Sequence, residues 1–401
     1  MLMTNNKKIL YLVGQNNINK KPLIPFNKTV CEFLNDLSKK LSTDKKILNY
    51  TDVKAFSFWC RKANIEKYKK QFEDGKFRLG LGLAFHITPS NIPTNFAYSF
   101  TFGLLAGNAN IVRIPTISYP QVNIICNAIK SLFNKKKYQQ IKRMNAFVKY
   151  EKNDEITAEF SAICDARIIW GGDTTIKEVR KFPMPETSIE INFADKYSFC
   201  VLDSMSLKNL KKKNLSELAD RFFNDTYLLD QNACSSPHLV VWIGNKNEKI
   251  KKLFWNEVYT IVKKKYELAP INIVKKYNNL LKDVIESNHI KSVKRYGNDL
   301  YRIKVKKIKS DIEKKRGKFG TFYEYDCKNI DDIAKIVSSK FQTLTYFGIE
   351  KLKILNFVIN NRLSGIDRIV PVGRALDIDV IWDGFDVEKN FVMLFHGQYK
   401  N

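Results

Sequence analysis

The chain has 401 residues, of which 44% are hydrophobic and 27% charged, and its formal net charge at pH 7 is +27. This length and apolar content indicate a globular protein of two α/β domains, and because no run approaches the roughly 18 apolar residues of a membrane helix and the start lacks a secretory signal, we expect a cytoplasmic protein with no membrane span. Lysine supplies most of the charge in runs typical of a solvated surface, and we expect no nucleic-acid binding, which would show arginine and aromatic residues interleaved in a known module.

The first 75 residues alternate short apolar runs with polar, lysine-rich stretches, of which residues 53–70 form the clearest helical pattern. No chemistry is apparent in this segment. Residues 78–87 are mostly apolar and are followed by Thr88, Pro89 and further polar residues up to Pro93. This pattern predicts a buried strand that enters a turn.

A helix and a second strand follow this turn. Residues 96–105 are apolar on nearly all sides and end at Gly107, which is typical of a helix stop. Residues 110–114 then predict a short strand, and residues 121–130 predict another helix. Together with the first strand they form one β-turn-α-β unit.

A second unit of this kind lies further along the chain. Residues 166–170 predict a buried strand, residues 171–175 a polar turn, and residues 176–180 the start of a helix. Strands that alternate with helices imply a parallel sheet covered on both faces. Ligands of such sheets bind at the carboxyl ends of the strands, where both turns lie.

The second half of the chain contains one polar turn of interest. A strand at residues 198–202 and a helix at residues 215–230 lead into the polar residues 231–237, and a strand at residues 238–243 follows. The lysine-rich stretch 245–316 has helical periodicity. A last β/α passage begins after it, at residues 317–325.

The cysteines do not suggest a disulfide framework or a zinc site. They are seven, an odd number, widely spread and without a CxxC pair, and no histidine cluster has metal-ligand spacing. Cys126 and Cys200 lie in apolar patterns typical of buried, inert thiols. Cys234 lies in the predicted turn, where backbone amides would lower the pKa of its thiol. The local sequence leaves open a nucleophile and an ordinary loop cysteine.

Two glycine patterns are compatible with a nucleotide. Gly80 and Gly82 are half of a dinucleotide fingerprint, which is a weak signal without the third glycine. Gly171 and Gly172 would let the backbone approach a phosphate, and Thr174 or the threonine after it would cap the following helix. A simple strand-to-helix loop is the other interpretation of this turn.

Several motifs between residues 77 and 385, in a shared order, carry a family resemblance. Residues 82–93 and 105–113 resemble the core of the aldehyde dehydrogenase superfamily. More closely, the chain resembles the LuxC-type acyl-CoA and acyl-protein thioester reductases, in the segments HITPSNIP (86–93), FAYS (96–99), GLLAGNAN (103–110), DQNACSSP (230–237) and WDG (382–384).

The resemblance implies an α/β, aldehyde-dehydrogenase-like fold with a Rossmann-like cofactor domain plus an α/β catalytic domain. We expect the nicotinamide cofactor domain at residues 1–200, with residues 1–75 as a helical N-terminal part. The catalytic domain with the nucleophilic cysteine would span residues 201–380, and residues 381–401 would form a C-terminal segment.

The resemblance also implies the catalytic residues. Cys234 matches the nucleophile, and Asn91 matches the amide that forms the oxyanion hole with the backbone amide of Cys234. Glu190 lies near the general base of the superfamily, although the residues around it depart from the usual Gly-Gly pattern. His86 and His238 lie in or beside predicted strands, where a structural role is the more common one.

The cofactor implied by the resemblance is NADPH. Arg113 falls where the superfamily has a lysine that contacts the adenosine ribose, and a guanidinium there would also bind a 2′-phosphate. Gly171 and Gly172 fall at the cofactor turn of the superfamily. The expected cofactor-binding residues are Thr88, Pro89, Arg113, Gly171, Gly172 and Thr174.

The implied reaction is reduction of an acyl thioester, with a fatty acyl group as one form, to an aldehyde through an acyl-cysteine. The substrate would be acyl-CoA or an acyl-carrier protein, with an acyl-protein synthetase as a further partner and a homo-oligomer as the expected assembly. Two alternatives remain at this point. One is an aldehyde dehydrogenase that works in the oxidising direction and needs a water-activating base, and the other is a catalytically silent or nucleic-acid-binding protein.

Overall fold

The structure is a computed structural model that describes residues 9–244 and 247–395. It forms two compact units. The first comprises the chain up to Ala194 together with the part from Phe385 onward, and the second runs from Asp195 to Gly384. The division therefore lies ahead of residue 200, and the segment after residue 384 belongs to the first unit instead of standing apart.

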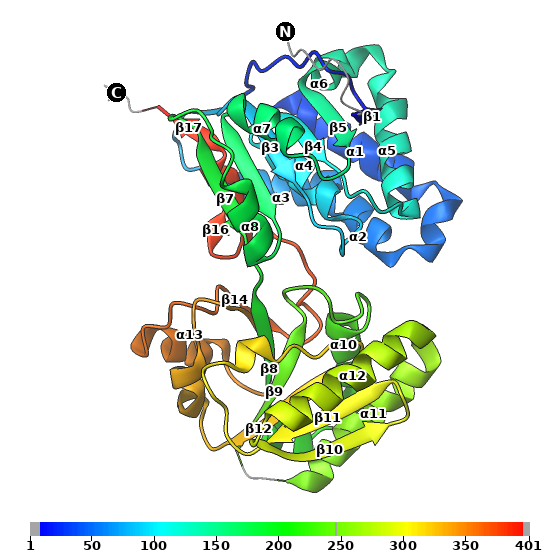
Figure 1. The fold of residues 1–401 in the computed structure, drawn as a ribbon, viewed down its shortest axis with the longest axis vertical. Coiled ribbons are helices and arrows are strands. Elements are labelled where there is room, and N and C mark those ends of the chain that lie inside the picture. Colours follow the sequence, from blue (N-terminus) through cyan, green and yellow to red (C-terminus); the bar gives the residue numbers. More distant parts are fainter. Residues whose placement is uncertain (1–8, 245–246, 396–401) are drawn as a thin grey trace. The chain divides into compact units, whose positions relative to one another are not determined.

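The first unit is built on a six-stranded sheet of order β1-β5-β4-β3-β6-β7 (Figure 1). All its neighbouring strands are parallel except β1, which pairs antiparallel with β5. Its strands are β1 (Leu10–Val13), β3 (Leu83–Ile87), β4 (Ala109–Arg113), β5 (Asn145–Lys149), β6 (Ala166–Trp170) and β7 (Ile189–Phe193). Because β4 and β6 lie on opposite sides of β3, the strand order reverses at β3, and the carboxyl ends there are the favoured ligand position of such a sheet.

Helices surround this sheet. They are α1 (Lys28–Ser42), α2 (Thr51–Trp59), α3 (Lys62–Phe72), α4 (Asn95–Leu105), α5 (Pro120–Phe133), α6 (Gln139–Met144), α7 (Asp154–Ala162), α8 (Asp173–Val179) and α14 (Val387–Asn390), with 3-10 turns η1 (Lys45–Asn49) and η2 (Lys136–Tyr138). Every residue of α4 is buried, which explains why its sequence is apolar on nearly all sides. The single helix predicted at residues 53–70 is instead two helices, α2 and α3, that meet at Cys60 and Arg61.

The apolar run at residues 78–87 also differs from the prediction of one strand. It divides into β2 (Arg78–Gly80) and β3, because Gly82 adopts a φ of +134°, which only glycine adopts readily. Strand β2 pairs with β17 (Val392–Leu394), so the returning end of the chain lies against the first unit.

The second unit has a seven-stranded sheet of order β10-β11-β12-β9-β8-β13-β14, parallel except for the β10–β11 pair. Its strands are β8 (Tyr197–Asp203), β9 (Pro237–Ile243), β10 (Ile290–Tyr296), β11 (Leu300–Val305), β12 (Thr321–Cys327), β13 (Phe341–Phe347) and β14 (Arg368–Pro371). The short strands β15 (Ile381–Trp382) and β16 (Phe385–Asp386) flank the division between the units.

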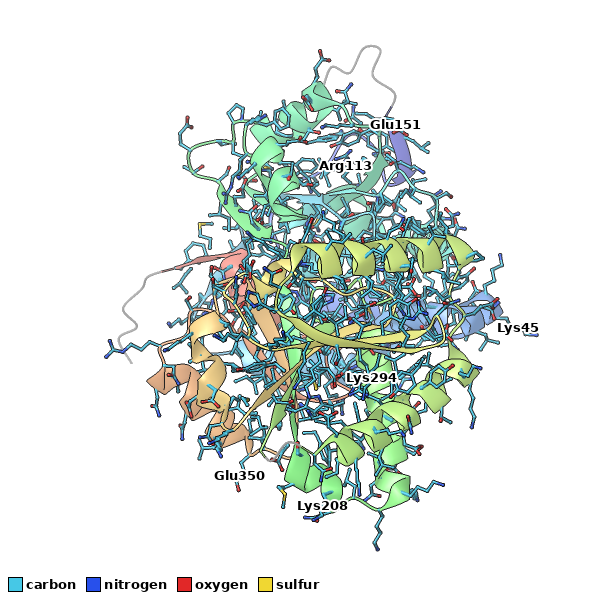
Figure 2. The ribbon with its side chains drawn as sticks, turned by 60° about the horizontal axis from the view of Figure 1, so that its bottom comes forward. Lys45, Arg113, Glu151, Lys208, Lys294 and Glu350 are labelled. Carbon is cyan, nitrogen blue, oxygen red and sulfur yellow. The ribbon has the colours of Figure 1, made fainter. Side chains whose placement is uncertain are left out.

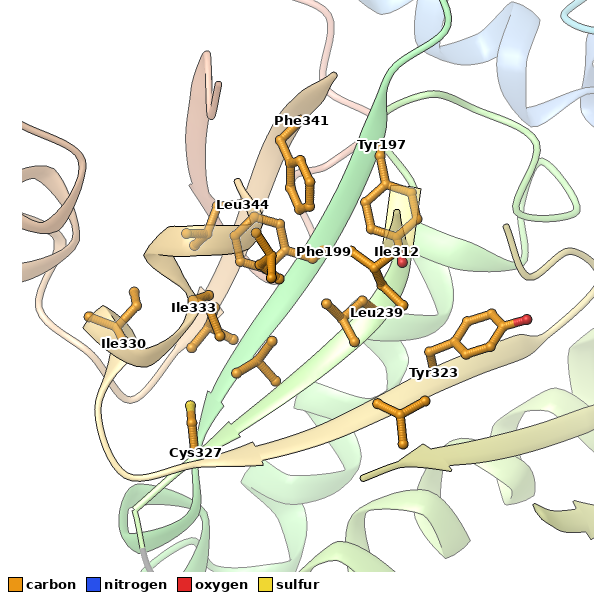
Figure 3. Close-up of a cluster of buried hydrophobic side chains, with 14 of the residues drawn as sticks. Tyr197, Phe199, Leu239, Ile312, Tyr323, Cys327, Ile330, Ile333, Phe341 and Leu344 are labelled. Atoms are coloured by element: carbon orange, nitrogen blue, oxygen red, sulfur yellow. The ribbon is translucent and has the colours of Figure 1, made fainter. Parts of the chain in front are cut away.

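The helices of this unit cover both faces of its sheet. They are α9 (Ser204–Lys208), α10 (Lys212–Thr226), α11 (Glu248–Lys265), α12 (Pro270–Glu286) and α13 (Lys351–Asn360), with η3 (Ile312–Lys314) and η4 (Ile330–Ile336). Since side chains alternate along a strand, Phe199 and Val201 of β8 join one core with η4 and α13, while Cys200 and Leu202 join another with α10 and α11. Figure 3 shows the first of these cores, with Phe199 beside Leu344.

The lysine-rich stretch 245–316 holds two strands that its helical periodicity did not predict. Strand β10 is the edge of the sheet, and only three of its seven residues are even partly buried. Charged residues such as Lys291 and Lys294 are typical of edge strands because they oppose pairing with another chain, and they hide the apolar alternation. The helix predicted at residues 215–230 ends earlier, at Thr226.

Many lysines lie on the surface as the sequence suggests, although Lys251 and Lys276 are buried. Lys45, Lys208 and Lys294 are exposed, and Figure 2 shows Lys45 and Lys208 extending away from the ribbon. Among the helices of residues 9–244 and 247–395, none is both long and apolar enough to cross a membrane. The same residues contain no group of histidine, cysteine and acidic side chains that would hold a metal ion.

Candidate active site

Cys234 lies in the turn between α10 and β9, and a buried glutamine fixes this turn. Gln231 has no exposed surface and a φ of +57°, an uncommon backbone conformation for a residue with a side chain. The side-chain nitrogen of Gln231 donates hydrogen bonds to the backbone carbonyls of Pro237 (2.8 Å) and Thr321 (3.1 Å). Its side-chain oxygen accepts hydrogen bonds from the backbone N–H groups of Gly320 and Thr321. Three of these bonds tie the turn to the start of β12, and the fourth ties it to the start of β9.

The residue before it strengthens the same anchor. Asp230 also has a positive φ, +53°, and its carboxylate accepts a hydrogen bond from the Tyr266 hydroxyl at 2.6 Å. Its carbonyl accepts from the Phe319 N–H at 3.1 Å. Two consecutive residues in the left-handed region persist only where the surroundings hold them, and such strain is common at functional sites.

The Cys234 thiol is contacted by a side chain that sequence reasoning missed. The Gln342 amide nitrogen lies 3.4 Å from the sulfur, and only 1% of the Gln342 residue is exposed. The same amide donates to the carboxylate of Asp383. The Ser198 hydroxyl donates to the Cys234 carbonyl at 2.6 Å and accepts from the Thr343 N–H. Cys234 is therefore held by its carbonyl from β8 and by its sulfur from β13.

The electrostatic surroundings contradict the prediction that turn amides lower the thiol pKa. Burial, followed by the Asp383 carboxylate, raises the pKa of Cys234 to about 12, while the hydrogen bond from Gln342 lowers it. Burial likewise raises the pKa of Asp383 to about 6, against the lowering effect of Gln342 and Lys196. The Cys234 thiol is therefore neutral, and the fraction present as thiolate depends on Gln342 and Asp383.

Exposure separates Cys234 from most other cysteines. All seven are free, and only Cys31 and Cys234 are partly exposed. Burial raises the pKa of Cys126 to about 12 and that of Cys200 further, as expected for inert core thiols. Of the cysteines with some access to solvent, only Cys234 lies in a turn fixed by buried amides.

Three strand ends of the first unit bring together the predicted cofactor residues. Thr88 and Pro89 follow β3, Arg113 ends β4, and Gly171 follows β6, and these strands are parallel neighbours. The Thr88 hydroxyl donates to the Arg113 carbonyl at 2.7 Å, which joins the first two ends. The four residues named here and Gly172 therefore lie at one edge of the sheet.

The turn after β6 is open. A Cβ atom added at Gly172 would meet nothing within 4 Å, whereas one at Gly171 would lie 3.1 Å from Thr175. Helix α8 begins directly at Asp173 with Gly172 as its N-cap, so the prediction that Thr174 or Thr175 caps this helix is wrong. Thr174 is exposed in the first turn instead. An exposed glycine backbone on the same sheet edge as the Arg113 guanidinium suits a dinucleotide phosphate.

Arg113 is the cation of this edge. Its guanidinium stacks over the Tyr150 ring, with 4.5 Å between Cζ and the ring centre. The side chain is partly exposed, and burial raises the pKa of Tyr150 although the Arg113 charge lowers it. A stacked guanidinium keeps its planar face fixed while its N–H groups stay able to bind phosphate.

Asn91 and Glu190 lie in different settings of the first unit. Asn91 is exposed in the turn between β3 and α4. Glu190, in β7, accepts hydrogen bonds from Arg167 Nε (2.9 Å), Arg180 Nε (2.7 Å) and Asn192 (2.8 Å). Burial raises the pKa of Glu190, but these donors outweigh it and hold the value below the ordinary one. A carboxylate engaged in this way is a poor proton acceptor, which argues against a general base.

The two histidines considered in the sequence are neutral. His86 is fully buried, with Nδ1 2.7 Å from the Ser99 hydroxyl and Nε2 2.9 Å from the Asn110 amide oxygen, and burial lowers its pKa to about 4. His238 stacks on Tyr197 with 5.5 Å between ring centres, and burial lowers its pKa to about 3. Both arrangements favour the structural role.

The sequence of the chain is similar to a known enzyme family. The family model described as acyl-CoA reductase (LuxC) matches residues 33–393. A long-chain acyl-protein thioester reductase of Photorhabdus laumondii is 23% identical over 188 residues, which are 46% of this chain and 35% of that protein. The match thus spans about a third of the relative's length.

Solved structures resemble the fold. An oxidoreductase from Marinobacter aquaeolei superimposes with a TM-score of 0.67 at 10% identity, covering 96% of this chain and 88% of the other. An aldehyde dehydrogenase of Mycobacterium tuberculosis, solved in complex with NAD+, gives 0.65 at 10% identity, covering 93% and 85%. These likenesses confirm the predicted aldehyde-dehydrogenase-like fold.

Proposed function

The chain belongs to the LuxC family of acyl-CoA reductases, and on this premise we propose that it reduces an acyl thioester to an aldehyde with a nicotinamide cofactor. The observation that supports this most directly is the Cys234 turn, in which a partly exposed thiol is held by buried Gln231 and contacted by buried Gln342. A series of acyl-CoA esters, each offered with NADPH or NADH, tests the proposal. Aldehyde formation is expected, and its absence with every ester would contradict the function.

The mechanism follows from the residues in sequence. The Cys234 sulfur attacks the thioester carbonyl, the carrier sulfur leaves with the proton that Cys234 gives up, and an acyl-cysteine remains. Asn91 and the backbone amide of Cys234 stabilise the oxyanion of the tetrahedral intermediate. A nicotinamide cofactor held at Thr88, Arg113 and Gly172 would supply the hydride that brings the acyl group of the acyl-cysteine to the aldehyde level. The Cys234 thiolate then leaves the thiohemiacetal and releases the aldehyde.

This direction of reaction needs no activated water, so no general base is required for hydrolysis. We assign Glu190 a structural role, because its carboxylate is engaged by Arg167 and Arg180. The oxidising aldehyde dehydrogenase considered from the sequence would need a free base there. The pairing of Glu190 therefore favours reduction.

The proposed cofactor site is the edge of the first sheet where β3, β4 and β6 end. The open backbone at Gly172 would leave room for a pyrophosphate, and the partly exposed Arg113 guanidinium would recognise a 2′-phosphate. We propose NADPH as the preferred cofactor. The residues proposed to hold it are Thr88, Pro89, Arg113, Gly171, Gly172 and Thr174.

Arg113→Ala is expected to raise the KM for NADPH by about tenfold or more while changing that for NADH much less. A charge-assisted hydrogen bond contributes about 1.5–3 kcal/mol, and each ~1.4 kcal/mol corresponds to a factor of ten. Initial rates at varied concentrations of each cofactor measure the effect. Lys130→Ala, an exposed change on α5, is the control. Equal use of both cofactors by the parent protein would exclude this role of Arg113.

Gln342 and Asp383 are expected to change the reactivity of Cys234 in opposite directions. Gln342→Leu removes a donor that lowers the thiol pKa, so the thiolate fraction at a given pH falls, by about tenfold per pKa unit. Asp383→Asn removes a charge that raises the pKa, so the fraction rises. Alkylation of Cys234 by iodoacetamide over a pH series measures both.

The partly exposed Cys31 serves as an internal control in the same samples, since it lies in the first unit while both replaced residues lie in the second. Unfolding temperatures show whether each variant keeps its fold. A Gln342→Leu protein whose Cys234 reacts as fast as in the parent, with the fold intact, would mean that the amide does not influence the thiol.

The remaining features are proposals on the same premise. The name of the Photorhabdus relative suggests a long-chain, fatty acyl group on a protein carrier, and the name of the family suggests CoA. An acyl-protein synthetase would then supply the acylated carrier. The first unit would bind the cofactor and the second would carry the acyl group on Cys234. The homo-oligomeric state and the cytoplasmic location stay predictions.

A further inference from the structure

A strongly basic groove of about 550 Å³ lies within the second unit. It is bordered by the end of α12, the start of β10, the end of β11 and the following loop with η3. This volume is in the range of small-molecule sites. Its cationic side chains are Lys282, Lys307, Lys309, Lys314, Lys315 and Arg316.

The acidic side chains of the groove do not balance these six cations. They are three, Asp283, Glu286 and Asp311, which leaves a formal charge of +3 from the charged lining. Asp283 is engaged by Lys315 at 2.8 Å and by the Tyr323 hydroxyl. In the described part of the chain, Lys307, Lys309 and Lys314 take part in no ion pair. Their mutual repulsion in a concave site favours a bound anion.

The groove is connected to the surroundings of Cys234. Arg316 lines the groove, and its charge acts on the Cys234 thiol. Its guanidinium is fixed by an ion pair with Asp195 at 2.6 Å, just before β8. Strand β8 carries Ser198, whose hydroxyl holds the Cys234 carbonyl. Arg316 therefore links the groove to the start of β8, the strand that holds the Cys234 turn.

Unpartnered polar atoms lie behind the groove wall on the same side. The Tyr197 hydroxyl, His238 Nδ1 and Glu313 Oε2 are buried without a hydrogen-bond partner among the described residues. Figure 3 shows Tyr197 next to Ile312, which is part of the groove lining. Buried polar groups without partners are rare in folded proteins, and a bound ligand or water commonly satisfies them.

We propose that this groove binds the phosphate groups of a nucleotide-linked thioester, the chemical class of acyl-CoA, with its thioester end directed along Arg316 towards Cys234. The proposal rests on the proposed reductase function and names its substrate class. Three lysines without partners suit the phosphates of such a carrier, and the concave, small-molecule dimensions suit a nucleotide better than a protein surface. The polar part of this substrate, between its phosphates and its thioester, would offer hydrogen-bond partners to the buried Tyr197 hydroxyl and the unpartnered atoms near it.

The test compares two thioesters of the same acyl group, one on CoA and one on N-acetylcysteamine, which has no phosphate. The variant replaces Lys307, Lys309 and Lys314 by alanine. Its KM for the CoA ester is expected to rise about tenfold, the order expected of three exposed ion pairs, while kcat/KM for the N-acetylcysteamine ester stays unchanged. The KM for NADPH should also stay unchanged.

A matched control replaces three exposed lysines of α11, Lys249, Lys252 and Lys264, by alanine and so removes the same charge from the same unit. This control variant should keep the parent's KM for the CoA ester, kcat/KM for the N-acetylcysteamine ester and KM for NADPH. An unchanged KM for the CoA ester in the groove variant would overturn the proposal. Equal losses with both thioesters would overturn it too, because the lysines would then act on folding or on the reaction itself.

Titration calorimetry measures the binding of CoA without turnover, and so tests the groove proposal independently of the proposed reductase function. Parent protein that binds CoA, with weaker binding in the groove variant only, supports the groove even if no thioester is reduced. Parent protein that reduces the N-acetylcysteamine ester but binds no CoA keeps the function and overturns the groove, as a protein carrier would then be the substrate.

Discussion

Cys234→Ala is expected to abolish both covalent acylation by a thioester and aldehyde formation. Removing a nucleophile that acts together with an oxyanion hole costs on the order of 10⁴-fold or more in turnover. The other thiols offer no replacement, because most are buried in apolar cores and Cys31 lies outside the second unit. A labelled acyl thioester, quenched in acid and mapped by peptide, measures the acylation.

Cys31→Ala is the matched control for this experiment, since Cys31 is the other partly exposed thiol. This variant should keep the label on Cys234 and keep full reductase activity. Label on Cys126, Cys164 or another cysteine would refute the mechanism. Undiminished activity of the Cys234→Ala protein would do the same.

Asn91→Ala is expected to slow turnover by about 100- to 1000-fold, the cost of removing one donor from an oxyanion hole. The thiol remains, so Cys234 should still be alkylated at the parent rate while its acylation is slowed. Cofactor binding should change little, because the Asn91 amide is proposed to stabilise the substrate oxyanion. Rapid-quench acylation and NADPH titration measure the two properties separately.

Asn123→Ala, at an exposed position of α5, provides the control for the loss of an amide in the same unit. The double variant that lacks both Cys234 and Asn91 should be no slower than Cys234→Ala alone. Without the nucleophile there is no tetrahedral intermediate for Asn91 to stabilise. Additive losses would show that Asn91 acts in a different step.

The local sequence alone determined several elements of the fold. Strand β6 (Ala166–Trp170) lies at the predicted residues, and α4 (Asn95–Leu105) begins one residue earlier than predicted. Continuous apolar runs that end in glycine or proline indicate buried strands and helices because the burial pattern is written in neighbouring residues. The ordered motifs likewise sufficed to indicate the LuxC family and a cysteine in a turn.

Tertiary structure alone decided the surroundings of that cysteine. Gln342, which contacts the sulfur, is 108 residues away in sequence, and Asp383 follows later still. The turn signals around Cys234 predicted a lowered thiol pKa, whereas burial and the Asp383 charge raise it. Solvent access and charge at a thiol are set by the elements that pack around it, so residues adjacent in sequence do not encode them. The basic groove has the same origin, because α12 and the loop after β11 form it only once they are folded together.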